Sequence, residues 1–193
     1  MRPRIAFAAT LGLAALFALR ARAIDFTPRP ETQVIDTYPI HYFSFADEDG
    51  RRVEYGPPSG WKCTGSPTRL SLENPAQTQA QASFNLLPVE KPGPHTAAQL
   101  ERFKAVATSR IPPDGADPVI TQEVGQHPIG NREAYAAHIS YNYFGLPWRL
   151  RVTFINLGKS TLQITCSAPG DAFETFTAAL DSSLYSWHWV DPK

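Results

Sequence analysis

Apolar positions recur along the chain with two different periods, and each period predicts a different kind of element. Steps of two predict strands, several of them bounded by Gly or Pro turns, at 40–45, 52–55, 61–63, 69–72, 82–89, 119–124, 135–143, 148–154 and 161–166. Steps of three and four predict a helix after Thr96 and another after Asp171. The order of strands, helix, strands, helix indicates an α+β fold with amphipathic helices packed on an antiparallel sheet.

Both predicted helices carry a start motif and an apolar stripe. Thr96 is followed three residues later by Gln99, which is the spacing of a capping box, and Asp171 and Glu174 repeat that spacing. Pro112 ends the first helix. The apolar stripes are Leu100, Phe103, Ala107 and Ile111 in the first helix, and Phe173, Phe176, Leu180, Leu184 and Trp187 in the second.

Strands 135–143 and 148–154 each have an apolar and a polar face. A four-residue loop at 144–147 places Tyr141 opposite Leu150 and Ser140 opposite Arg151. For the next turn a three-residue loop at 158–160 is favoured, whereas a two-residue loop moves Ile164 and Cys166 onto the polar face. That face gathers six candidate binding residues, which are His138, Ser140, Asn142, Arg149, Arg151 and Thr153.

The two arginines give this polar face its chemistry. Guanidinium groups match carboxylate and phosphate oxygens in pairs, so Arg149 and Arg151 predict an anion site. The alternative is a solvated face, or Arg stems lying under a helix. At the loop, Phe144 and Trp148 are candidates for contact with a sugar or a protein, and the alternative for them is core packing.

The N-terminus has the three parts of an export signal. Two arginines precede an apolar run at 5–19, and Ala21 and Ala23 supply the small residues that precede a cleavage site. The alternative is an uncleaved anchor. Residues 1–23 hold four arginines and no acid, so their removal changes the net charge from zero to −4. We therefore expect a periplasmic or secreted protein without nucleic-acid binding and without a stable membrane span after signal removal.

The two cysteines are interpreted through this oxidising compartment. Cys63 follows Trp61, and Cys166 shares strand phase with Ile164, so both are candidates to point inward. We predict a disulfide between Cys63 and Cys166, in preference to a nucleophilic thiol.

No catalytic or metal-binding motif stands out in the sequence. The five histidines are scattered, Ser59 lacks the strand-to-helix context of a nucleophile elbow, and phosphate loops and dinucleotide fingerprints are missing. Carboxylate pairs have no specificity among 18 acids. We therefore predict no catalytic residues, no metal and no cofactor.

Several of these features together resemble the PsbP-like/DcrB-like group. They are Pro58, Gly60 and Trp61 after an opening hairpin, an amphipathic helix, the meander at 130–166, and a closing helix that includes 176–184. The resemblance covers about residues 38–190 and implies an α/β/α sandwich, often exported, with binding or accessory roles and no shared catalytic site. Domain boundaries then follow as a signal at 1–23, an extended lead-in at 24–37 and one globular domain at 38–193.

Two functional hypotheses remain at this point. The first is an exported, non-catalytic accessory or binding domain with an unknown protein or small-molecule partner in the cell envelope. The second is an exported hydrolase whose site is assembled only in three dimensions. A cavity with a perturbed His or carboxylate beside a nucleophile favours the enzyme. An exposed aromatic or basic patch favours binding.

Overall fold

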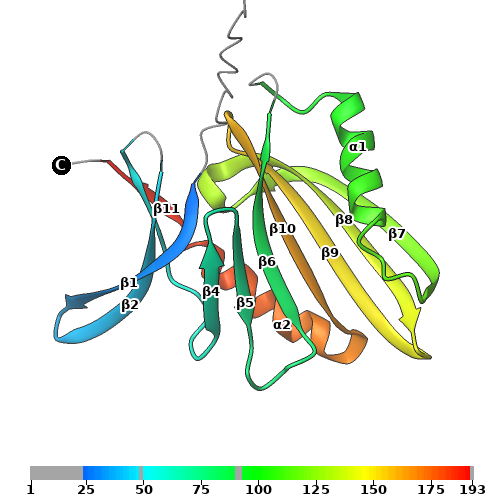
Figure 1. Ribbon diagram of the computed structural model, residues 1–193, viewed down its shortest axis with the longest axis horizontal. Coiled ribbons are helices and arrows are strands. Elements are labelled where there is room, and N and C mark those ends of the chain that lie inside the picture. The colour runs from blue at the N-terminus through cyan, green and yellow to red at the C-terminus, as the bar shows by residue number, and fades with distance from the viewer. Residues whose placement is uncertain (1–23, 48–49, 90–92, 192–193) are drawn as a thin grey trace, which may run out of the picture.

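The computed structural model describes residues 24–47, 50–89 and 93–191, and within them the chain forms two antiparallel sheets and two α-helices (Figure 1). The predicted α+β class is confirmed. The predicted signal segment lies outside the described residues. No helix in the described part is long and apolar enough to cross a bilayer.

The large sheet has the strand order β4-β5-β6-β10-β9-β8-β7, and the small sheet has the order β1-β2-β3-β11. The helices are α1 (Ala97–Thr108) and α2 (Gly170–Leu184). The strands of the large sheet are β4 (Lys62–Ser66), β5 (Arg69–Glu73), β6 (Gln81–Pro88), β7 (Gly115–His127), β8 (Arg132–Tyr143), β9 (Leu146–Asn156) and β10 (Ser160–Pro169). Those of the small sheet are β1 (Asp25–Ile35), β2 (Tyr38–Ala46), β3 (Arg52–Tyr55) and β11 (His188–Val190).

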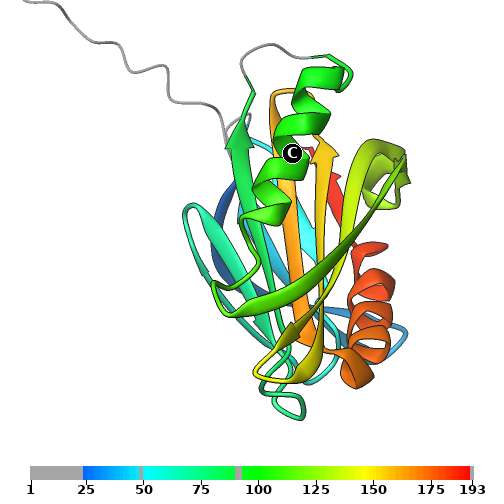
Figure 2. The same cartoon turned by 90° about the vertical axis from the view of Figure 1, so that its right-hand side faces the viewer.

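The large sheet is covered on both faces (Figures 1 and 2). On one face α1 packs over β8 and β9, where the Phe103 ring stacks on Phe154 with centroids 4.3 Å apart. On the other face lie α2 and the small sheet, whose shared core includes Phe26, Phe45 and Trp187. Apolar burial on both faces holds the layers together, and it leaves α2 resting on the face that carries His138 and Arg151.

The starts of the two helices differ from each other. Thr96 and Gln99 form the predicted capping box on α1. The predicted box at Asp171 is wrong, because α2 begins at Gly170, directly after β10, with Pro169 at the cap position and no side-chain cap. Asp171 instead lies in the first turn, where a carboxylate interacts favourably with the helix dipole.

The segment predicted as a lead-in is the edge strand of the small sheet. Phe26 is fully buried, and β1 pairs with β2 along most of its length. Pro28 and Pro30 interrupt the period-two pattern, and an edge strand is where a sheet tolerates proline. β1 also lies against Gly65 of β4, where an added Cβ would stand 2.0 Å from the carbonyl oxygen of Phe26.

The β7 strand is longer than the predicted 119–124. It runs from Gly115 to His127 along the edge of the large sheet, with a bulge between Ala116 and Val119 where Asp117 has a φ of 52°. The extension carries Gly125 and His127 past the predicted end. Both residues therefore lie on the sheet opposite β8, next to α2.

Candidate functional site

The turn between β8 and β9 differs from the predicted loop and resets the pairing. It has two residues, Phe144 and Gly145, with φ values of 49° and 78°. Tyr141 therefore pairs with Trp148, His138 with Arg151 and Ser140 with Arg149. The predicted four-residue loop is wrong by a shift of two, which leaves every side chain on its predicted face because the strand period is two.

The turn between β9 and β10 also has two residues, at 158–159, and the amide of Leu157 donates to the carbonyl of Ser160 at 2.9 Å. Gly158 has a φ of 87°, which suits such a tight turn. The favoured three-residue loop is wrong, and the alternative register is observed, in which Ile164 pairs with Thr153 and Cys166 with Arg151. Both faces of β10 are buried, so apolar pattern alone does not separate the two registers.

Both predicted anion-binding arginines are paired with carboxylates of α2. Arg151 donates to the two oxygens of Asp181 at 2.9 and 2.5 Å. Arg149 forms an ion pair with Glu174. These contacts give both arginines carboxylate partners within the protein, in place of the predicted anionic ligand, and they place both Arg stems beside the helix.

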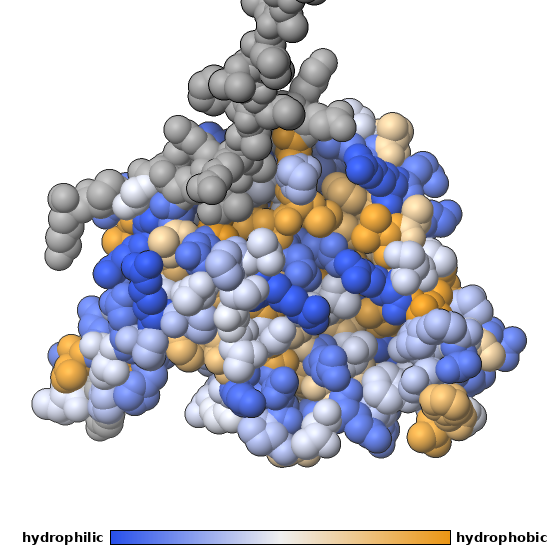
Figure 3. Space-filling model, in the orientation of Figure 1, coloured by the Kyte–Doolittle hydropathy of each residue, from blue (hydrophilic) through white to orange (hydrophobic). Residues whose placement is uncertain are grey.

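The remaining candidate residues separate into two places. His138 lies beside Arg151 in a cavity, whereas Phe144 lies at the end of the hairpin with 75% of its surface exposed. Trp148 is half-buried against Tyr143, and Ser140 and Asn142 are exposed on β8. Figure 3 shows hydrophobic residues gathered at that hairpin end.

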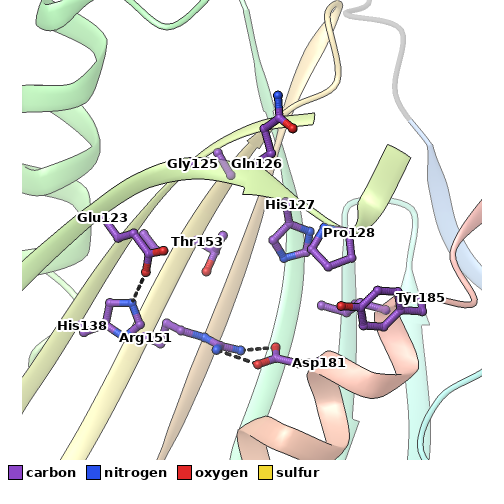
Figure 4. A pocket seen from close by; sticks show the side chains of 13 residues that line it. Glu123, Gly125, Gln126, His127, Pro128, His138, Arg151, Thr153, Asp181 and Tyr185 are labelled. Atoms are coloured by element: carbon purple, nitrogen blue, oxygen red, sulfur yellow. Dashed lines mark hydrogen bonds and ion pairs between the residues drawn. The ribbon is translucent and has the colours of Figure 1, made fainter. Parts of the chain in front are cut away.

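The cavity lies between the β7–β9 edge of the large sheet and the C-terminal half of α2, and its volume is about 260 Å³ (Figure 4). Gly125, Ala134 and Ala136 leave room on the sheet because their side chains are absent or small. The other lining residues are Glu123, Gln126, His127, Pro128, His138, Arg151, Thr153, Asp181, Leu184 and Tyr185.

His127 is the most perturbed imidazole that lines the cavity. Burial lowers its pKa to about 4, and Arg151 lowers it further while Asp181 opposes the shift. The Nδ1 atom accepts a hydrogen bond from the Ile129 amide at 3.3 Å, so the neutral ring carries its proton on Nε2. Among the described residues no group accepts from that proton, so it is available to a ligand.

The charged side chains of the cavity are arranged in pairs. Burial alone lowers the pKa of Arg151, but the hydrogen bond and the charge of Asp181, together with Cys166, outweigh burial and the pKa is raised. The second pair joins Nε2 of His138 and Oε2 of Glu123 at 3.8 Å. Two carboxylates thus face one cavity, and each already has a partner.

The cysteines are free thiols, so the predicted Cys63–Cys166 disulfide is not formed. Cys63 pairs with Leu72, Leu72 with Ala82, and Ala82 with Cys166, so β5 and β6 lie between the two thiols. Three strand spacings amount to roughly 14 Å, whereas a disulfide needs Cα atoms within about 7 Å. The prediction failed because both residues point inward from strands that are not neighbours.

Neither thiol is placed to act as a nucleophile. Cys166 is fully buried beside Arg151, and burial raises its pKa to about 11. Burial also raises the pKa of Cys63 to about 12. Among the cavity-lining groups, the Thr153 hydroxyl is the candidate for a nucleophile, and this residue is 6% exposed. Within the described residues no three His, Cys, Asp or Glu side chains are grouped as metal ligands.

A solved structure with a similar fold is found by comparison. LpqN, which is involved in cell envelope biogenesis of Mycobacterium tuberculosis, matches with a TM-score of 0.52 at 12% identity, over 85% of this chain and 92% of its own. The chain shares its fold with LpqN. At this identity the likeness concerns the fold alone.

Two other solved structures match with lower scores. Cyanobacterial PsbP from Synechocystis has a TM-score of 0.46 at 14% identity, over 96% of this chain and 99% of its own. The Pseudomonas aeruginosa protein PA94 has a TM-score of 0.43 at 12% identity, over 86% and 98%. The resemblance to the PsbP-like group is confirmed at the level of the fold. No protein-family model and no curated protein sequence matches the chain.

Only part of this cavity is predictable from the sequence pattern. His138, Arg151 and Thr153 were predicted together on one face, and all three line it. His127 was missed because it lies three residues beyond the predicted strand end. Asp181 was missed because it is a polar residue that lies between the apolar positions of α2. The helix pattern does not indicate which strand such a residue will contact.

Proposed function

We propose that this chain is an exported, non-catalytic binding domain that holds a small ligand in the cavity between the large sheet and α2. The observation that carries the proposal is the His127 Nε2–H, a donor on the cavity lining that finds no acceptor among the residues that the structure describes. Ligand sites are concave, and a few converging polar groups give them their specificity. The envelope role of LpqN, which has this fold, supports a role outside the cytoplasm.

The hydrolase hypothesis has less support from the same cavity. A perturbed His is present, but hydrolysis by a side-chain nucleophile also needs an accessible hydroxyl or thiolate beside it. No hydrogen bond joins the Thr153 hydroxyl to a His or a carboxylate among the described residues, so nothing there activates it, and Cys166 is buried with a raised pKa. Both oxygens of Asp181 accept hydrogen bonds from Arg151, so this carboxylate is held by the arginine rather than beside a nucleophile.

The binding proposal is tested with uncharged fragments. Titration of the isotope-labelled protein with phenol, cyclohexanol and 2-pyrrolidone is expected to give saturable NMR shifts at Gly125, Ala136 and Thr153. Ala136→Phe places a ring in the cavity and is expected to abolish those shifts. Ser140→Phe, on the same strand and face but outside the cavity, is the matched control. Shifts that survive Ala136→Phe, or that never saturate, overturn the proposal.

Export is tested separately. Fractionation of cells that express the full chain, followed by N-terminal sequencing, is expected to give an extracytoplasmic protein that begins at Ile24. A chain that still begins at Met1 and sediments with membranes supports the anchor instead.

A further inference from the structure

The more buried part of the cavity has little net charge, because its one arginine, Arg151, is paired with Asp181. Arg151 and Asp181 neutralise each other, and Glu123 has His138 beside it. Glu123 is also the more exposed carboxylate, with 75% of its side chain accessible, so water screens it. An anionic ligand meets two carboxylates here, and a cationic ligand competes with Arg151 for Asp181. The charge pattern therefore favours a neutral ligand.

The polar groups of the cavity supply donors and acceptors side by side. His127 offers a donor at Nε2, and the Thr153 hydroxyl both donates and accepts. Each oxygen of Asp181 accepts one bond from Arg151 and keeps a second lone pair that a ligand can use. A ligand hydroxyl also donates and accepts, so neighbouring hydroxyls match this arrangement better than a carbonyl or an amine does.

The cavity also has an apolar wall and a small size. Pro128, directly after β7, and Leu184 of α2 give the lining apolar surface, and Tyr185 lines the cavity with most of its ring exposed. Such surfaces pack against the C–H faces of a saturated ring. The volume of about 260 Å³ lies below the roughly 300–1,000 Å³ of sites for drug-sized ligands, so the occupant is about one ring in size.

We propose that the cavity binds a neutral sugar ring, either a free monosaccharide or the terminal residue of a glycan. This inference rests on the binding function proposed above. His127 and Thr153 contact ring hydroxyls, the Arg151–Asp181 pair contacts two neighbouring hydroxyls, and Tyr185 covers the ring.

The inference is tested by NMR titration of the labelled protein with glucose, galactose, mannose and N-acetylglucosamine. Their charged counterparts, glucuronate and glucosamine, are titrated under the same conditions. At least one neutral sugar is expected to give saturable shifts at Gly125, Ala136 and Thr153, with binding at least tenfold tighter than either charged counterpart. Methyl glycosides and disaccharides of that sugar distinguish the two sources, since a terminal glycan residue keeps its affinity when C1 is substituted.

Two variants of equal shape connect binding to the cavity. Thr153→Val removes a lining hydroxyl at nearly constant volume and is expected to weaken sugar binding about tenfold. Thr121→Val makes the same change on β7, outside the lining, and is expected to leave binding unchanged. Equal binding of a charged counterpart, or identical affinities for the two variants, overturns the sugar inference. If the uncharged fragments bind but no sugar does, the inference fails while the proposed binding function stands.

Discussion

His127 illustrates how a single residue responds to its place in the fold. The ring lies at the end of β7, beside Arg151 and Asp181, and burial keeps it neutral at pH 7. The sequence offers no sign of this, because the residue is separated from the predicted strand by Gly125 and Gln126. His138, by contrast, was predicted on the correct face, because strict alternation along β8 fixes which side chains share a face.

The lowered pKa of His127 predicts that acid destabilises the protein. The unfolded chain binds a proton on this ring with a pKa of about 6.5, and the folded chain does so only near pH 4. The contribution of neutral His127 to the free energy of unfolding is therefore fully present above pH 6.5. It is lost as the pH drops toward 4, and the loss amounts to up to about 3 kcal/mol. Urea unfolding at pH 7.0 and 4.5 measures the effect.

His127→Phe removes the titrating group at similar size and is expected to reduce that pH dependence. His41→Gln, at an exposed position of β2, is the control and is expected to retain it. If His127→Phe keeps the full dependence, the loss of stability comes from other groups.

The cysteines give a second prediction at this scale. A thiol reagent is expected to find two thiols per chain after denaturation without reductant, because the fold keeps the two residues two strands apart. In the folded protein at pH 8 both are expected to react slowly, since burial keeps them protonated. A titre of zero after denaturation contradicts the free-thiol state.

At the scale of elements, the sequence predicted which segments are strands and helices better than how they pair. The pattern of buried positions distinguishes strand registers that differ by one residue but not those that differ by two. The observed β8–β9 register differs from the predicted one by two residues, so this pattern could not identify it. Turn chemistry decides such cases. The two-residue turn could not be recognised from the sequence, because a type I′ turn normally has Asn or Gly where this chain has Phe144.

Phe144→Asn is expected to stabilise the protein by about 0.5–1 kcal/mol, because asparagine adopts positive φ more readily than phenylalanine. Thermal and urea unfolding measure the change. Leu146→Asn alters another exposed apolar residue, directly after the two turn residues, and is not expected to stabilise. Equal gains from both substitutions attribute the effect to lost surface hydrophobicity rather than to relieved backbone strain.

The two ion pairs between β9 and α2 are expected to differ in strength. Asp181→Ala leaves Arg151, whose side chain is only 17% exposed, without its partner, and we expect a loss of about 2–3 kcal/mol. Glu174→Ala removes the partner of a more exposed arginine and is expected to cost less than about 0.5 kcal/mol. Both variants place alanine in the same helix, so urea unfolding compares them directly. Equal losses contradict the difference in burial.

At the scale of the whole molecule, the sequence predicted the class and the helices on both faces of a sheet. It did not predict the division into two sheets. Amphipathic stripes such as Phe173–Trp187 report which side of a helix is buried, and that information is local. The pairing of β11 with β3 brings together segments more than 130 residues apart, and no local pattern encodes it.

The close approach of β1 to Gly65 has a consequence for how the layers hold together. With hydrogen as its side chain, Gly65 lets the carbonyl of Phe26 rest directly on β4. A methyl group at this point acts as a wedge, because the atom it meets belongs to the backbone and cannot rotate away. The substitution Gly65→Ala is therefore expected to push the small sheet outward and to expose the aromatic cluster of Phe26, Phe45 and Trp187 to water.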